Sequence, residues 1–134
     1  MKKALTYTAM VVAIFTFAVM GCTPPGSSSA PEFAGTWQAT FLGVTETWVL
    51  SSGSASVTDS GGGLDGTANW SITTYDTVTK HIQLSLSSAT GVWALLYSKG
   101  APLYMTYSVV GSTLTMSYSA SSYPSSGTQP YLKQ

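Results

Sequence analysis

The residues that could take part in acid–base or nucleophilic chemistry are few in this chain, and they stand far apart. His81 is the single histidine among 134 residues, and Cys22 is the single cysteine. Apolar residues alternate with polar ones after His81, which puts its side chain on the face opposite Ile82. We therefore interpret His81 as a solvated or rim residue. Because no nucleophile and base are paired, we expect no enzymatic activity.

The acidic residues show no spacing that would assemble a catalytic pair. Four of them occur singly at expected strand ends and turns, namely Glu46, Asp59, Asp65 and Asp76. Without a neighbouring histidine or cysteine they lack the ligand set of a metal site. Paired carboxylates of the kind used in general acid–base catalysis are not indicated either. We therefore interpret them as solvated charges and predict neither a metal nor another cofactor.

Charge is scarce along the whole chain. Charged residues make up 7% of the sequence, the formal net charge is zero, and all five basic residues are lysines. A chain of this composition has no basic surface to bind phosphates, which argues against a nucleic-acid partner. Serine, threonine and glycine supply much of the polarity, and these residue types suit short strands and turns better than helices.

From residue 35 onward, apolar and polar residues alternate in short segments separated by turn residues. This is the pattern of antiparallel strands that are buried on one face. It is clearest at Ile82, Leu84 and Leu86, whereas the segment VWALLYS (92–98) is compatible with a strand or a short helix, and we favour the strand. The sequence thus predicts an all-β fold, a small antiparallel up-and-down barrel of about eight short strands. Closure would remove exposed strand edges.

Large aromatic side chains recur on the face that is predicted to point inward. These are Trp37, Trp48, Trp70, Trp93, Tyr107 and Tyr118. They either fill the core, since side chains can fill an eight-stranded barrel completely, or line a pocket for an apolar ligand. The candidate ligand-binding residues are Trp48, Trp70, Trp93, Tyr107 and Tyr118. Four further tyrosines are expected outside, where they could contact proteins or glycans: Tyr97, Tyr104, Tyr123 and Tyr131.

The N-terminal segment has the organisation of a secretory signal. Lys2 and Lys3 precede an apolar run over residues 4–20 that is short for a membrane span. The run ends in Val19-Met20-Gly21-Cys22, which resembles the lipobox of bacterial lipoproteins. The resemblance implies a signal peptide at 1–21 that is cleaved before Cys22, and a lipid anchor of acyl chains such as palmitate on that cysteine. Such an anchor binds a bilayer almost irreversibly.

The segment after the cysteine has the composition of a linker. Residues 23–31 read TPPGSSSAP, which combines stiff proline with flexible glycine and serine. We assign 22–33 to the lipidated cysteine and linker, 34–120 to the barrel domain, and 121–134, with its two prolines, to an irregular tail. If the host sorts lipoproteins by the residue after the cysteine, Thr23 indicates the outer membrane of a bacterial cell envelope. The expected partner is the membrane, through Cys22.

Two segments of the body resemble the lipocalin-like proteins of the calycin group. Gly35-Thr36-Trp37 opens the first expected strand, and YSVVGSTLTMSYS (107–119) forms a closing hairpin. The resemblance implies that Trp37 plugs one barrel end and that the interior binds a small apolar molecule. In lipocalins an arginine from a late strand packs over this tryptophan, and this chain has none. A charged ligand headgroup would meet only Lys80 and Lys99. The alternative is a solid-cored scaffold or adhesion module that binds an envelope protein or a host surface.

Overall fold

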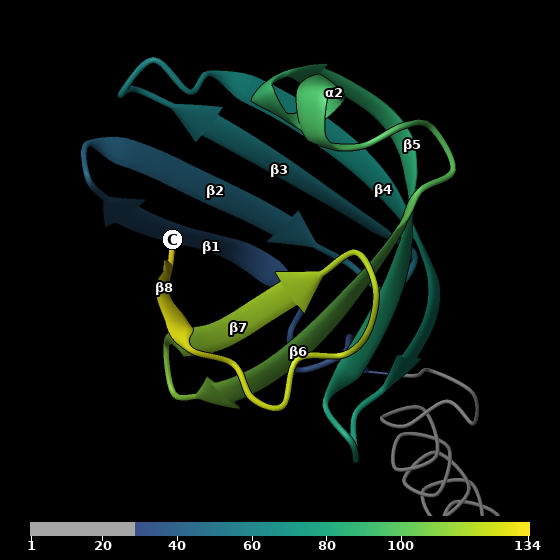
Figure 1. The fold of residues 1–134 in the computed structure, drawn as a ribbon. Helices are drawn as coiled ribbons and strands as arrows, with labels where there is room; N and C mark the ends of the chain where they lie inside the picture. The colour runs from purple at the N-terminus through teal and green to yellow at the C-terminus, as the bar shows by residue number, and fades with distance from the viewer. Residues whose placement is uncertain (1–28) are drawn as a thin grey trace, which may run out of the picture.

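The computed structural model describes residues 29–134, so the predictions for Cys22 and the signal peptide lie outside the described residues. The described chain forms a closed antiparallel barrel in which each strand pairs with the next and the last pairs with the first (Figure 1). The predicted all-β, up-and-down barrel is thereby confirmed. The elements are β1 (Gly35–Phe41), β2 (Val44–Leu50), β3 (Ser54–Ser60), β4 (Gly66–Asp76), β5 (His81–Gly91), α2 (Val92–Leu96), β6 (Pro102–Val110), β7 (Thr113–Ser119) and β8 (Gln129–Lys133).

The alternation of apolar residues explains which face of each strand is buried. In β5, Ile82, Leu84 and Leu86 are buried, and the intervening side chains are more exposed. Neighbouring strands are paired in a register that brings such residues together, as at Trp37 opposite Trp48. β4 carries two register shifts against β5, and bulges of this kind increase the local bend that closure requires. The barrel interior is therefore one continuous apolar core.

The segment 92–98 does not form the strand that we predicted from the sequence. Val92–Leu96 is helical, and the Tyr97 backbone N–H closes this single turn on the Trp93 carbonyl. The reason lies one residue earlier, because Gly91 has a φ of 60° and a Cβ there would stand 2.0 Å from the Asp65 carbonyl oxygen. Only glycine tolerates that conformation and that close approach. The chain therefore leaves the sheet at Gly91, and α2 packs against β4 and β5.

The C-terminal tail is also more regular than predicted. Gln129–Lys133 forms β8, which pairs with β7 on one side and with β1 on the other. Tyr131 points inward and is fully buried, so its expected outward position is wrong. The two prolines obscured this strand in the sequence, but Pro130 occupies an exposed position in it. The total of eight strands was right, although β8 replaces the strand expected at 92–98.

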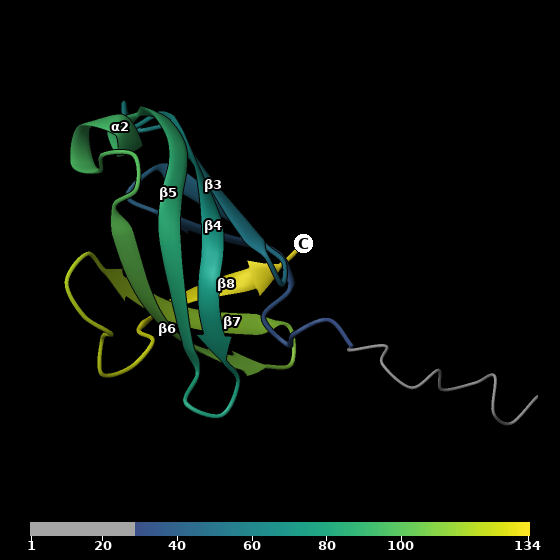
Figure 2. The same ribbon diagram turned by 90° about the vertical axis from the view of Figure 1, so that its right-hand side faces the viewer.

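The two ends of the barrel are built differently, as Figure 2 shows. We call one the α2 end, which is formed by the β1–β2 turn, the 61–65 loop and α2. We call the other the Phe33 end, which is formed by residues 29–34 and the β4–β5 and β6–β7 turns. In Figure 2, α2 lies at the top and the N-terminal part of the described chain lies toward the bottom.

The Phe33 end is closed by the residues that precede β1. Phe33 is fully buried, and its ring makes edge contacts with Tyr75 and Tyr107 at centroid distances of 5.3 Å. The Trp37 indole N–H donates to the Phe33 carbonyl oxygen at 2.8 Å. Lys133 of the last strand lies over the Trp37 ring, 5.5 Å from its centroid. Phe33, which we expected to be part of the linker, therefore belongs to the barrel core.

Candidate functional site

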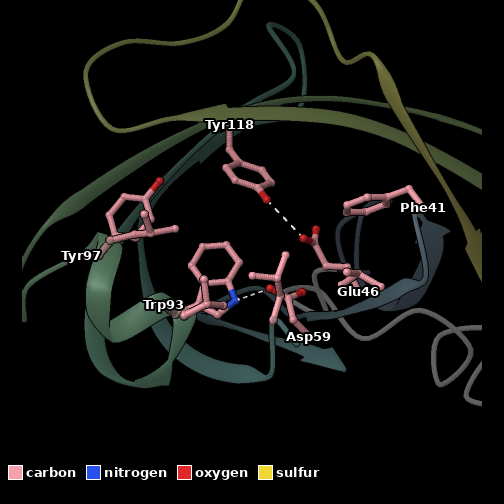
Figure 3. A pocket seen from close by; sticks show the side chains of 10 residues that line it. Phe41, Glu46, Asp59, Trp93, Tyr97 and Tyr118 are labelled. Carbon is pink, nitrogen blue, oxygen red and sulfur yellow. Dashed lines mark hydrogen bonds between the residues drawn. The ribbon is translucent and has the colours of Figure 1, made fainter. Parts of the chain in front are cut away.

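A cavity of about 220 Å³ opens at the α2 end. Figure 3 shows labelled side chains from several elements facing this space. Most of its wall is apolar or aromatic, whereas two carboxyl groups, Glu46 and Asp59, supply its charge. Those buried carboxyl groups distinguish it from the hollow on the outside of the barrel between β1 and β8. The lining residues are Phe41, Val44, Glu46, Asp59, Leu64, Val92, Trp93, Leu96, Tyr97 and Tyr118.

Glu46 and Asp59 are brought together by the pairing of β2 with β3, in which they are direct partners. Glu46 has the same parity as the inward Trp48, and Asp59 the same parity as the inward Val57. Their exposed fractions are 3% and 9%. Our interpretation of both as solvated charges is therefore wrong. The signal was present in the alternation, which places these two acids on the inner face.

Glu46 is held by three neutral donors. The Trp48 indole N–H donates to Oε1 at 2.6 Å, and the Tyr131 hydroxyl donates to the same oxygen. The Tyr118 hydroxyl donates to Oε2 at 3.3 Å, as drawn in Figure 3. Burial and the Glu46 charge both raise the pKa of the Tyr118 and Tyr131 hydroxyls, so they remain protonated donors. Both Glu46 oxygens are thus satisfied.

Asp59 is only half satisfied. The Trp93 indole N–H donates to Oδ2 at 2.8 Å, but the buried Oδ1 has no hydrogen-bond partner among the described residues. Burial, then the nearby charge of Glu46, and least a hydrogen bond that the protonated group can make to Glu46 together raise the pKa of Asp59 to about 6, against the opposing effect of the Trp93 hydrogen bond. The cavity therefore contains a buried carboxyl group with one oxygen that has no hydrogen-bond partner among the described residues.

The lysines of the described chain do not compensate this charge. Lys80 forms an ion pair with Glu32, at the Phe33 end. Lys99 follows α2 but does not line the cavity. Lys80 and Lys99, the two lysines expected to meet a charged headgroup, thus lie elsewhere, and the charged groups of the cavity wall are acidic. This arrangement favours a cationic or hydrogen-bond-donating ligand group over an anionic one.

The sequence-predicted aromatic residues divide between the cavity and the packed core. Trp93 and Tyr118 line the cavity. Trp48 reaches Glu46 from the core, and Trp70 packs edge-on against Trp93 with ring centroids 6.1 Å apart. Tyr107 lies at the Phe33 end, where its hydroxyl donates to Glu32 at 3.2 Å, and Trp37 is buried at the same end.

Two other side chains differ in their relation to the cavity. Tyr97, which we expected outside the barrel, is half-buried and lines the cavity, and burial raises its pKa. His81 starts β5 and stacks on Tyr123 with ring centroids 4.1 Å apart. The histidine is therefore not part of the cavity lining.

Comparisons of the chain with protein-family models, curated proteins and solved structures find no match. Among residues 29–134 there is no helix with the length and apolar character that a membrane span requires. Within the same residues, no three His, Cys, Asp or Glu side chains gather to hold a metal ion. The geometry of the α2 end is therefore the basis for a functional proposal.

The buried Asp59 should make stability depend on pH. Its pKa is raised from the usual 3.8 to about 6, so the folded chain binds this proton more tightly than the unfolded chain. The free energy of unfolding should therefore fall as the pH rises from about 4 to about 6. Above pH 6, ionisation of Asp59 should lower the free energy of unfolding by up to about 3 kcal/mol. In Asp59→Asn the amide oxygen can still accept from Trp93 and the NH₂ group can donate to Glu46. We expect this variant to be more stable near pH 8.

Urea unfolding across this pH range measures the effect. Asp65→Asn is the matched control, because the Asp65 side chain is exposed in the 61–65 loop and accepts the Gly61 backbone N–H, which an amide oxygen can also accept. The control should follow the pH profile of the natural chain. Parallel profiles for Asp59→Asn and the natural chain would show that Asp59 does not carry the pH dependence.

Proposed function

We propose that the protein is a lipid-anchored lipoprotein of the bacterial cell envelope, placed at the outer membrane, whose lipocalin-like barrel binds a small molecule. The ligand site is the cavity at the α2 end, and the role is binding rather than catalysis. The observation that carries this proposal is the half-open space of about 220 Å³ with aromatic walls and two buried carboxyl groups. Concave, mostly apolar sites with a few polar groups are typical of small-molecule binding.

The size of the cavity limits the ligand. An apolar cavity of about 150 Å³ is large enough for benzene, and typical ligand pockets begin at about 300 Å³. The space here therefore suits a single ring with a short chain. It does not extend through the barrel, because Trp48 and Trp70 fill the interior beneath it. A long acyl chain would not fit, so the small apolar ligand expected from the sequence is restricted to molecules of about one ring.

The position of the cavity is compatible with a tether. Residues 29–32 lie beside Tyr75 and Thr77 at the Phe33 end. An anchor at Cys22 would therefore attach to the barrel from that end, and the cavity opens at the other. A ligand could enter from the periplasm or from the exterior without the barrel leaving the membrane.

Binding of 2-phenylethanol to the full-length protein in phosphatidylcholine nanodiscs tests the proposal. This neutral probe has one ring and a short chain, and Trp93 in the cavity wall provides a fluorescence signal. We expect saturable quenching in the natural protein. Val44→Phe should weaken binding about tenfold or more, because the added ring occupies the cavity that Val44 lines.

Val49→Phe is the matched control for this experiment. Val49 lies in the same strand, β2, but points outward with 46% of its side chain exposed. The Val49→Phe variant should bind the probe as the natural protein does. Equal binding by Val44→Phe and Val49→Phe would place the probe outside the cavity, and empty nanodiscs account for partition into lipid.

The exposed rim of the same end favours a second candidate function, the scaffold or adhesion module. Leu42 in the β1–β2 turn and Leu95 and Leu96 in α2 are largely exposed at this end of the barrel, and Leu96 lines the cavity. Exposed apolar residues that cluster in this way are typical of protein contact surfaces. An envelope protein that covers this rim would also cover the cavity. Absence of saturable binding for every small probe would favour this second function.

A further inference from the structure

Asp59 Oδ1 is a buried acceptor that lacks a hydrogen-bond donor among the described residues. The side chain is nine-tenths buried and lines the cavity, and Oδ1 is without a partner in the described chain. The other three carboxylate oxygens of the site accept hydrogen bonds from Trp93, Trp48, Tyr131 and Tyr118. A buried acceptor without a donor is strongly unfavourable, and more so when it is charged. The ligand is therefore expected to bring the missing donor.

The charge of the site further restricts the chemical class of the expected donor. The two carboxyl groups are cross-strand partners, and no lysine of residues 29–134 lines the cavity to balance them. A neutral hydroxyl would fill the hydrogen bond but leave the charge uncompensated. A cationic N–H does both, since hydrogen bonds between two charged groups are the strong ones. A carboxylate or phosphate group would be repelled.

The walls argue for an organic cation rather than a metal ion. Trp93, Tyr97 and Tyr118 present aromatic surface to the cavity, which attracts ammonium groups and packs against apolar ones. Calcium prefers about six to eight oxygen ligands, whereas this cavity offers two carboxyl groups in an otherwise largely apolar wall. An inorganic ion would leave most of the space empty.

On these grounds the geometry points to a small amphiphilic amine as the ligand, whose ammonium N–H donates to Asp59 Oδ1 while its apolar body contacts Trp93, Tyr97 and Tyr118. This inference rests on the proposed function, because it requires the cavity to bind a small molecule. It adds the chemical class of that molecule. Recognition is by the Asp59 carboxylate, with Glu46 as its neighbour on the paired strand.

Acid should release the amine. Below pH 6 a proton occupies Asp59, whose pKa is raised to about 6, and a neutral carboxyl group no longer attracts a cation. Among residues 29–134, the titratable groups that face Asp59 or share its cavity are Glu46 from β2, Tyr97 after α2, Tyr118 from β7 and Tyr131 from β8. Burial raises the pKa of all three tyrosines, so their hydroxyls stay protonated throughout. The affinity for an amine should therefore fall with decreasing pH, whereas that for a neutral probe should not.

Three probes of one size test the inference on the full-length protein in phosphatidylcholine nanodiscs near neutral pH. They are 2-phenylethylamine, which is cationic, 2-phenylethanol, which is neutral, and 3-phenylpropanoate, which is anionic. We expect the amine to bind about tenfold or more tightly than the alcohol, and the carboxylate to bind most weakly. Asp59→Asn should lose this preference, because it removes the carboxylate that would pair with the ammonium group, and Asp65→Asn should behave as the natural protein.

Other results would contradict either the amine inference or the proposed small-molecule function. Equal binding of amine and alcohol would overturn the amine inference and leave the proposed small-molecule function in place. Tightest binding of the carboxylate, or displacement of the amine by calcium chloride alone at similar concentration, would also overturn it. Absence of binding by all three probes would instead remove the proposed function itself. Retained amine preference in Asp59→Asn would show that Asp59 is not the recognition group.

Discussion

Replacing Trp37 with alanine is expected to lower the free energy of unfolding by about 3 to 5 kcal/mol. The side chain is fully buried at the Phe33 end, where it lies beneath Lys133 and donates to the Phe33 carbonyl oxygen. The substitution removes a large apolar surface, leaves a cavity, and deprives that carbonyl of its donor. Urea unfolding followed by far-ultraviolet circular dichroism measures the change, which should be independent of any ligand.

Val110→Ala is the control for this substitution, because Val110 ends β6 with 76% of its side chain exposed. A surface change of this kind normally stays within about 0.5 kcal/mol. A loss below about 1 kcal/mol for Trp37→Ala would mean that the Phe33 end does not depend on this side chain for its packing.

Replacing Cys22 with serine is expected to abolish both fatty-acid labelling and membrane fractionation. The serine hydroxyl cannot replace the thiol that receives the acyl group, and the anchor is the proposed attachment of the protein to the membrane. The barrel should remain folded, because its core begins at Phe33 and the anchor precedes it by a linker. Metabolic labelling with palmitate and fractionation of cells that produce each variant measure the effect.

Thr23→Ser is the matched control, since it changes a neighbouring hydroxyl residue and keeps the cysteine. It should be labelled and fractionate as the natural chain does. Labelled, membrane-bound Cys22→Ser protein would refute the lipoprotein proposal, and the ligand-binding proposal would then have to stand without a tether. The urea midpoint of Cys22→Ser should match that of the natural chain.

The proposed site combines stability costs with a binding role. An ionised Asp59 beside Glu46 destabilises the folded chain above its pKa of about 6. Natural binding sites often retain such unfavourable groups because function requires them. Asp59→Asn therefore links the two kinds of experiment, since it should raise stability near pH 8 and remove the preference for an amine. A variant that gains stability while keeping that preference would separate the two roles.

The alternation of apolar residues was enough to predict the fold class, and the structure confirms it. Ile82, Leu84 and Leu86 alternate with polar residues, and a strand with this pattern has one face to bury. With few charges and many such segments, closure into a barrel is the arrangement that buries those faces without leaving free edges. Local sequence therefore determined the strands, their inward faces and the barrel class.

Local sequence was less informative where a short segment is compatible with two conformations. VWALLYS fits a strand or a helix, and its conformation depends on the approach of Gly91 to Asp65, which are distant along the chain. The tail contains two prolines and is a strand only because β7 and β1 both offer it hydrogen-bonding partners. In each case a contact between distant segments overrides the local preference.

The candidate site shows the same division most clearly. The sequence determined that Glu46 and Asp59 have inward parity, through their alternation with Trp48 and Val57. Only the tertiary structure decided that they are cross-strand partners, that three donors satisfy Glu46, and that Asp59 Oδ1 has none among the described residues. The physical reason is that alternation sets the face of a side chain, whereas register and barrel closure set its neighbours.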